Sequence, residues 1–477
     1  MSVSKEKVPA GSARCPGPSW DDLAEADTKP VPEFLMQDAY THLGSEPLAT
    51  GRYTSPEFFR REVERMWPNV WQFAAREEEL PEPGDVVLYE NAGRTYLLVR
   101  QPDGSVRAIH NVCLHRGRKL RDESGWAQEL RCPFHGFTWN LDGSLKTIPC
   151  AWDFPHLKDC DMNLPQAQVG RWAGYIFIQE NSGGPTLEEF LAPLPEHHSR
   201  WTHEDCVTTL WVAKLVEANW KTCAEAFMEA WHSVVTHPQI LPFAGDANTK
   251  YYIYGDNVNL AITPFAVMSP HLSREQRGQD WIIEQMLKYN GRSAAAGLKV
   301  EIPEGGTARS ALAAVNRQRF GESDKRDYTE VSDSEMIDAF TYNVFPNFSP
   351  WGGFPPNIVY RWRPWPDQDH TLMEIRRLTR VPRGQPHPRA APMRLLKEDE
   401  PWSSVEEMKV QGAIFDQDWV NLPSIHQGLK SSKTGMIQLS EYQEIRIRHF
   451  AQTLDKYLAP VERTRAGSAP NSTRRST

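Results

Sequence analysis

The sequence lacks the features of a membrane-spanning or secreted protein. It has no window of about eighteen uninterrupted apolar residues, the length a helix needs to cross a bilayer. The N-terminal stretch MSVSKEKVPAGSARCPGPSW also lacks the apolar core of a secretory signal. We therefore expect a soluble, cytoplasmic protein.

Positive charge and cysteine are also scarce. Lys and Arg number 53 against 62 Asp and Glu, which gives a formal net charge of −9. An acidic chain without a long basic run is a poor candidate for nucleic-acid binding. The seven cysteines are an odd number spread over 477 residues. In a cytoplasmic enzyme such cysteines are more often metal ligands or buried thiols than disulfides. With 40% hydrophobic residues, the chain is not expected to be disordered as a whole.

Turn residues and hydrophobic periodicity divide the chain into five segments. Ser55 and Pro56 form a helix-start signal, and from about Gly84 short strands alternate with turns, as in an antiparallel β-module. The later pattern mixes strands around 357–363 and 371–379 with helices near 217–237, 308–320 (ending at Gly321) and 441–458. We expect a partly disordered N-terminal arm at 1–54, a helix packing on the second domain at 55–69, a β-rich domain at 70–182, an α+β domain at 183–461 and a disordered tail at 462–477.

Two cysteines and two histidines recur at a spacing that suits a metal site. The segments NVCLHRGRKL and LRCPFHGFTW contain a Cys-x-His pair and a Cys-x-x-His pair, separated by 16 residues. Two facing loops could present this set to a tetrahedral zinc ion, or to a [2Fe–2S] cluster with two cysteines on one iron and two histidines on the other. The mixed order within each pair argues against zinc, because common zinc fingers pair Cys with Cys and His with His. The four residues are Cys113, His115, Cys132 and His135.

This pattern resembles the Rieske domain of ring-hydroxylating oxygenases and Rieske ferredoxins. It differs from the respiratory Rieske proteins, which carry an additional cysteine in each loop. The resemblance implies that Cys113 and Cys132 bind one iron and that His115 and His135 bind the other. Neutral imidazoles make such a cluster less negative and raise its potential, so it can accept electrons from a reductase. The cluster transfers one electron at a time, and a second site is therefore needed to oxidise an organic molecule.

A second set of ligand-type side chains lies in the segment EANWKTCAEAFMEAWHSVVTHPQI. Its two histidines, His232 and His237, are five residues apart, which on an ideal helix separates them by roughly 140° around the axis. They can share a metal only if the helix distorts or ends between them, and Pro238 fits a helix that ends there. A non-haem Fe(II) oxygenase holds its metal with two histidines and one carboxylate, which leaves positions open for O₂.

The same segment resembles the mononuclear iron motif of Rieske oxygenase catalytic domains. It has Ala226 and Trp231 where that motif often has Asn and Tyr, and neither departure removes a ligand. By this resemblance the third iron ligand lies on a late helix, in the stretch AIFDQDWVNLPSIHQGL. Asp418 matches the family spacing best, and Asp416 is the competing carboxylate.

Glu229 lies three residues before the first histidine of this motif. By resemblance it takes the place of the acidic residue that links a Rieske histidine of one subunit to an iron histidine of its neighbour, here His135 to His232. A carboxylate can accept a hydrogen bond from the second nitrogen of each metal-bound imidazole, which fixes both rings. The simpler alternative is a solvated acidic residue on a helix.

Both motifs together imply the oxygenase (α) component of a Rieske non-haem iron oxygenase. The implied fold class is α+β, with an antiparallel β Rieske [2Fe–2S] domain followed by a helix-grip (START-like) α+β catalytic domain. By analogy the active form is a head-to-tail homotrimer. The chain has no dinucleotide-binding glycine fingerprint, so a separate reductase, with or without a ferredoxin, is expected to supply electrons from NAD(P)H. The expected reaction uses O₂ at mononuclear Fe(II) to hydroxylate or oxidatively demethylate an aromatic or largely apolar small molecule, as in aromatic hydrocarbon catabolism.

Two other functions stay open on the sequence alone. One is a monooxygenase of a small quaternary amine, a substrate that would want an aromatic cage. The other is a Rieske electron carrier with an inactive catalytic domain, against which the presence of His232, His237 and Asp418 argues. Monohydroxylation, dihydroxylation and demethylation all use the same metal set. A β subunit would belong to a separate gene and leaves no mark on this sequence.

Overall fold

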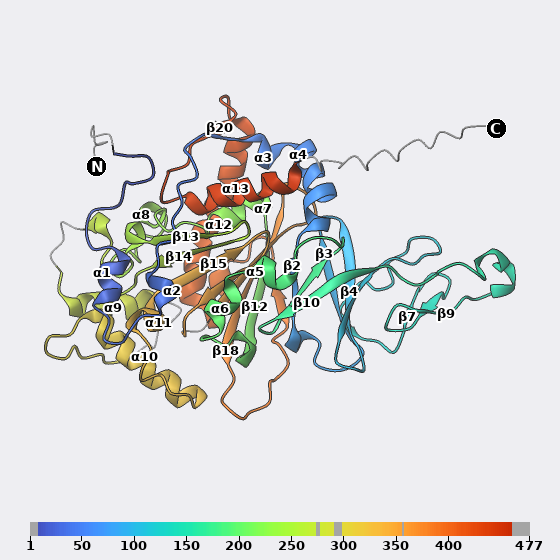
Figure 1. The fold of residues 1–477 in the computed structure, drawn as a ribbon, viewed down its shortest axis with the longest axis horizontal. Coiled ribbons are helices and arrows are strands. Elements are labelled where there is room, and N and C mark those ends of the chain that lie inside the picture. The colour runs from blue at the N-terminus through green and yellow to red at the C-terminus, as the bar shows by residue number, and fades with distance from the viewer. Residues whose placement is uncertain (1–7, 273–276, 291–297, 355–356, 460–477) are drawn as a thin grey trace, which may run out of the picture.

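The computed structural model describes residues 8–272, 277–290, 298–354 and 357–459 (Figure 1). The expected disordered tail at 462–477 lies outside the described residues. None of the helices in the described part of the chain is long and apolar enough to cross a membrane. Two large sheets build the molecule, one for each of the expected β-rich and α+β domains.

The first sheet is antiparallel, with strand order β2-β11-β10-β5-β4-β3-β6. Strand β11 is buried on both faces, and its continuous apolar run, YIFIQ at 175–179, fits that position. A small sheet, β7-β8-β9, extends from it and lies at the far right end of the molecule in Figure 1. The strands are β2 (Gln72–Arg76), β3 (Asp85–Asn91), β4 (Arg94–Arg100), β5 (Val106–His110), β6 (Gly125–Trp126), β7 (Leu130–Arg131), β8 (Thr138–Trp139), β9 (Leu145–Thr147), β10 (Gln166–Trp172) and β11 (Tyr175–Gln179).

The second sheet has eight strands in the order β13-β14-β15-β16-β17-β18-β12-β19, antiparallel except for the last pair. Two long helices, α12 and α13, lie over it, as expected for a helix-grip domain (Figure 1). The strands are β12 (Cys206–Val216), β13 (Lys250–Tyr254), β14 (Val258–Thr263), β15 (Ala339–Val344), β16 (Ser349–Gly352), β17 (Asn357–Pro364), β18 (Thr371–Arg380) and β19 (Met393–Leu395). The helices are α5 (Leu187–Leu191), α6 (Leu194–His198), α7 (Trp220–Glu225), α8 (Ser233–Thr236), α9 (Gln279–Tyr289), α10 (Ala308–Asp324), α11 (Asp333–Ile337), α12 (Lys409–Ser431) and α13 (Ile445–Leu458).

Three helices differ from the sequence prediction. The helix expected over 217–237 is broken, since α7 ends at Glu225 and the short α8 begins only at Ser233. The helix expected to end at Gly321 continues to Asp324, because Lys325 adopts the left-handed conformation that terminates it (φ +62°). The helix expected near 441–458 begins four residues later, at Ile445.

The N-terminal arm is ordered over its described residues and packs on the second domain. Trp20 is 1% exposed, and its indole Nε1 donates a hydrogen bond of 2.9 Å to Asp338. Ser55 caps the helix that follows, accepting from the backbone N–H of Phe58. The arm and this helix contain α1 (Trp20–Glu25), α2 (Glu33–Met36), α3 (Gly51–Thr54), α4 (Pro56–Arg61) and β1 (Leu48–Ala49), which pairs with β20 (Met436–Ile437).

Candidate metal centres

The predicted cluster ligands lie on two loops of matching backbone geometry. The first loop follows β5, and the Gly117 N–H donates back to the Cys113 carbonyl at 3.0 Å. The second joins β7 to β8, and the Gly136 N–H donates to the Cys132 carbonyl at 3.0 Å. The two glycines have φ of +77° and +79°, a conformation that lets each loop turn back tightly. Each loop thus presents one thiol and one imidazole.

The four side chains of these loops converge. The Cys113 and Cys132 thiols are within hydrogen-bonding reach, and each residue is 2% exposed. The imidazoles of His115 and His135 have centroids 4.7 Å apart. Among the described residues, the buried Nδ1 of His115 has no hydrogen-bond partner, although a neutral imidazole nitrogen normally finds one. Two buried thiols, two adjacent imidazoles and an orphaned ring nitrogen fit a [2Fe–2S] cluster with mixed ligands.

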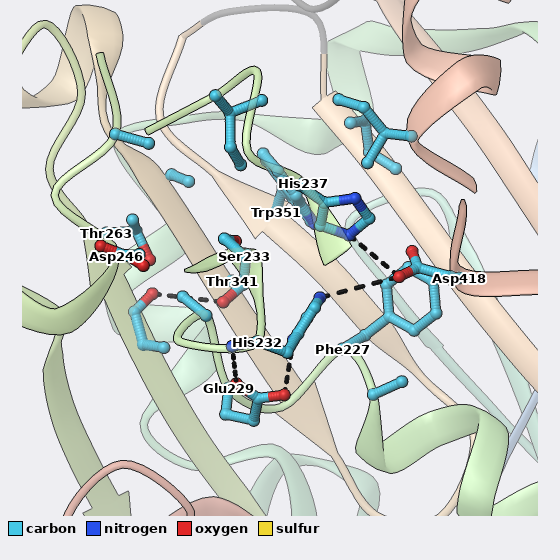
Figure 2. Close-up of a pocket in the computed structure, with 18 of the residues that line it drawn as sticks. Phe227, Glu229, His232, Ser233, His237, Asp246, Thr263, Thr341, Trp351 and Asp418 are labelled. Atoms are coloured by element: carbon cyan, nitrogen blue, oxygen red, sulfur yellow. Dashed lines mark hydrogen bonds and ion pairs between the residues drawn. The ribbon is translucent and has the colours of Figure 1, made fainter. Parts of the chain in front are cut away.

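The second predicted set also comes together, at the ends of the short helix α8. His232 precedes α8 and His237 follows it, so the break in the expected long helix brings both imidazoles to one side. Asp418 reaches them from α12: its Oδ1 lies 2.9 Å from Nε2 of His237 and 3.7 Å from Nε2 of His232. One donor atom from each residue falls within 4.8 Å of the others. Figure 2 shows the three side chains pointing toward one another. This donor set, two imidazoles and a carboxylate, suits non-haem Fe(II).

The other nitrogen of each imidazole is held by a neighbouring side chain. Glu229 Oε1 lies 2.5 Å from Nδ1 of His232, and its Oε2 accepts the backbone N–H of His232 at 3.1 Å (Figure 2). Gln417 Oε1 lies 2.8 Å from Nδ1 of His237. Both Nδ1 atoms therefore carry the proton, which leaves both Nε2 lone pairs free for a metal. Gln417 was not predicted from the sequence; its only signal is its position next to Asp418.

The competing carboxylate, Asp416, is engaged elsewhere. Its Oδ1 accepts the backbone N–H of Trp402 at 2.7 Å, and its Oδ2 accepts the hydroxyl and the backbone N–H of Ser403 at 2.5 and 3.2 Å. These bonds tie α12 to the turn at 402–404. The structure therefore brings Asp418, rather than Asp416, to the histidine pair.

The described cluster loops and the three-ligand set lie far apart within one chain. In Figure 1, α8 lies in the left part of the molecule, whereas β7 and β9, which flank the second cluster loop, lie at the far right. His135 is exposed, and next to it Phe134 is 57% exposed. Near the other site Trp231 is 39% and Val235 81% exposed. The linkage predicted between Glu229 and His135 is therefore not made inside this chain.

A cavity of about 180 Å³ opens beside the three-ligand set. Its walls are mostly aromatic and aliphatic. They come from the α7–α8 and α8–β13 connections, β14, β15, β16, β17, α12 and α13. Phe227 packs on Tyr360 and Phe415 with centroid distances of 4.8 and 6.1 Å. The volume suits a small organic molecule, and the apolar walls keep water away from one that binds.

Fold and ligand sets together define a two-domain iron protein, with a Rieske domain and a mononuclear non-haem iron domain. The family model for the ring hydroxylating alpha subunit (catalytic domain) matches residues 194–460, and that for the Rieske [2Fe-2S] domain matches residues 70–158. The chain therefore belongs to the family of ring-hydroxylating α subunits. This confirms the predicted family, fold class and pair of metal groups.

Known proteins that resemble the chain act on chemically diverse substrates. The carnitine monooxygenase oxygenase subunit of Acinetobacter baumannii is 30% identical over 192 residues, which are 39% of this chain and 51% of that protein. The chain thus spans about half the length of the curated relatives it matches. A quaternary ammonium Rieske monooxygenase in its apo form has a TM-score of 0.60 at 18% identity, covering 87% of this chain and 97% of the other. Naphthalene 1,2-dioxygenase with bound indole has a TM-score of 0.61 at 18% identity, covering 88% and 94%. The structural matches show the shared fold.

Proposed function

We propose that this protein is the oxygenase component of a Rieske non-haem iron oxygenase. The observation that carries the proposal is the convergence of His232, His237 and Asp418 on one point at the wall of a small, mostly apolar cavity. These three residues would hold mononuclear Fe(II), and Cys113, His115, Cys132 and His135 would hold the [2Fe–2S] cluster. When bound, the cluster supplies single electrons and the mononuclear iron supplies positions for O₂.

Hydrogen bonds to the histidines prepare the site for its metal. Glu229 and Gln417 keep the Nε2 atoms of His232 and His237 directed at Asp418. The cavity would hold the substrate next to this point and exclude water. For a monooxygenation the balance is C–H + O₂ + 2 e⁻ + 2 H⁺ giving C–OH + H₂O. A dioxygenation places both oxygen atoms in the product, again with two electrons and two protons.

Partner proteins complete the electron supply in this proposal. A separate reductase, directly or through a ferredoxin, would oxidise NAD(P)H and reduce the cluster. Because the two metal sites lie far apart in one chain, Glu229 would accept from His135 of a neighbouring copy in a cytoplasmic homotrimer, and the exposed Phe134 and Trp231 would be covered there.

The aromatic and aliphatic walls support an aromatic or largely apolar substrate for hydroxylation or demethylation. A second candidate, the oxidation of a quaternary amine, is favoured by one observation: the acidic side chain of Asp246 is buried in the same wall. Relatives named as carnitine and glycine betaine monooxygenases also support it.

The decisive experiment combines metal analysis with a single turnover under ¹⁸O₂. We expect about three irons per two labile sulfides in each chain. We also expect labelled product from the reduced protein with a panel of aromatics, methoxy-aromatics and quaternary amines. Two labelled oxygens in the product indicate a dioxygenase, and one, or released formaldehyde, indicates a monooxygenase. About two irons, and a cluster that reoxidises without product, would show an electron carrier instead.

A further inference from the structure

Two charged side chains line the cavity in addition to Glu229 and the candidate iron ligands. Asp246 lies in a short 3₁₀ turn before β13 and is 1% exposed, and Arg446 lies on α13 and is 0% exposed. No ion pair joins them to each other. In Figure 2 Asp246 and Thr263 lie across the drawn site from Asp418.

Asp246 has an incompletely satisfied carboxylate. Its Oδ1 accepts the Ser269 hydroxyl at 2.7 Å, but among the described residues its Oδ2 has no hydrogen-bond partner. The imidazole Nε2 of His271 lies 3.9 Å from Oδ2, beyond hydrogen-bonding distance. Burial raises the pKa of this carboxyl group, while hydrogen bonds from Ser269 and the Ala247 backbone lower it. A cation brought into the cavity beside such a buried anion stabilises it.

Arg446 is the opposite case, a buried cation that forms no ion pair with an acid among the described residues. Its Nε donates to Asn259 Oδ1 at 2.6 Å, and its Nη1 donates to Thr341 Oγ1 and to the Met228 carbonyl at 3.2 and 3.4 Å. These are neutral acceptors, and Nη2 has no partner in the described part of the chain.

Two other buried arginines of this protein, Arg76 and Arg361, are paired with acids. Nε of Arg76 lies 2.6 Å from Oε1 of Glu78, and Nη2 of Arg361 lies 2.6 Å from Oε2 of Glu374. For Arg446, burial lowers the guanidinium pKa to about 9. Unlike Arg76 and Arg361, Arg446 has no acidic partner among the described residues, so its charge and its free Nη2 group are available for an anion at the cavity wall.

We propose that the cavity binds a small zwitterion, with an alkylated ammonium group at Asp246 and a carboxylate at Arg446. A cation alone would leave the guanidinium uncompensated, and an anion alone would leave the carboxylate uncompensated. The aromatic rings of Phe227, Trp351 and Tyr360 in the same walls suit the methyl groups of a quaternary nitrogen. This inference rests on the proposed function, because it assumes that the cavity beside the three-ligand set is the substrate site.

Four ligands of matched shape separate the two charges. Glycine betaine carries both, choline carries only the cation, 3,3-dimethylbutanoate carries only the anion, and 3,3-dimethylbutan-1-ol carries neither. Titration calorimetry on the iron-loaded protein without O₂ gives each Kd. We expect glycine betaine to bind at least about tenfold more tightly than either singly charged analogue, and the neutral alcohol to bind most weakly. Equal affinities, tightest binding of the neutral alcohol, or no glycine betaine binding below about 10 mM would overturn the proposal.

Variants assign each preference to its residue. Asp246→Asn should abolish the preference for ammonium over the carbon isostere, and Arg446→Gln should abolish the preference for carboxylate over alcohol, each by about tenfold or more. Ser269→Ala keeps the Asp246 charge and should keep the ammonium preference. Arg446→Lys keeps a positive charge and should retain part of the carboxylate preference.

Three further results distinguish the explanations. If the wild type shows no ammonium preference and His271→Gln creates one, His271 compensates the charge at Asp246 and the proposal is wrong. Charge-selective binding without any oxygenated product would refute the proposed oxygenase function but leave the zwitterion site standing. Product formation from neutral aromatics, without charge preference, would refute the zwitterion site alone.

Discussion

Glu229 and His232, three residues apart in the chain, are joined by a contact of 2.5 Å between Oε1 and Nδ1. The same carboxylate also accepts the backbone N–H of His232, so it holds the ring from two directions. Nε2 of that imidazole faces Asp418 on the other side. The carboxylate therefore fixes the protonation and the direction of one candidate iron ligand.

The first prediction concerns electron transfer through this contact. Glu229→Gln keeps an acceptor for Nδ1 of His232 but removes the charge and the second carboxylate oxygen. We expect both metal sites to fill and the melting temperature to stay close to wild type. Reoxidation of the reduced cluster in a single turnover should slow by about 10- to 100-fold. Stopped-flow absorbance of the cluster measures this rate.

Two companion variants make that test specific. Glu229→Asp should restore part of the rate, because it keeps the carboxylate. Glu284→Gln makes the same chemical change at an exposed position of α9 and should have no effect. A wild-type reoxidation rate in Glu229→Gln would show that Glu229 has no positioning role.

The choice between Asp418 and Asp416 gives the second prediction. Asp418→Ala should lose the mononuclear iron and keep the cluster, so that iron falls from about three to about two per chain. Asp416→Ala should keep all the iron. It should instead lower stability by about 1–3 kcal/mol, because three hydrogen bonds to the turn at 402–404 are lost. Metal analysis and urea unfolding of both variants check this. The reverse pattern would make Asp416 the ligand.

The sequence predicts the two loops that bring the candidate cluster ligands together, but only part of the arrangement of the candidate iron ligands. The Cys113 and Cys132 loops are local, so their spacing predicts their geometry. The five-residue separation of His232 and His237 shows that the helix must break, but not where. The break follows contacts from distant parts of the chain, including Phe227 against Phe415 and the Met228 carbonyl against Arg446 on α13. Such contacts have no local signal.

The same limit explains what the sequence did not reveal about the surroundings of the site. Gln417 reaches His237 across 180 residues, and Asp246 shows no spacing that relates it to either histidine. The buried Trp20 of the N-terminal arm pairs with Asp338, 318 residues away, which composition cannot indicate. Local pattern predicts which residues can bind metal; packing decides which side chains support them.

Gln417 gives the third prediction. Gln417→Leu removes the acceptor at Nδ1 of His237, so the ring loses its fixed tautomer and orientation. We expect Fe(II) affinity at the mononuclear site to weaken by about 10- to 100-fold, with the cluster unaffected. Gln417→Glu should retain or strengthen binding. Gln427→Leu, at an exposed position of the same helix, is the matched control. Iron retention during graded chelation measures the effect, and identical chelation curves for the two Leu variants would contradict the prediction.

The last prediction concerns pH and a carboxyl group outside the ligand set. Burial raises the pKa of Glu225 from its ordinary value of 4.5 to about 8, although a hydrogen bond of 3.0 Å from the Tyr53 hydroxyl lowers it. The folded protein thus holds a proton on Glu225 over a range where the unfolded chain has lost it. Unfolding then releases a proton, so the free energy of unfolding falls as pH rises from about 4.5 to 8.

Glu225→Gln is permanently neutral and should escape this loss. Its stability should match wild type near pH 5 and exceed it by about 2–4 kcal/mol near pH 8. Tyr53→Phe removes the hydrogen bond that lowers the pKa and should make the decline steeper. Urea unfolding midpoints at both pH values measure the difference, and parallel declines in wild type and Glu225→Gln would show that Glu225 is ionised in the folded protein.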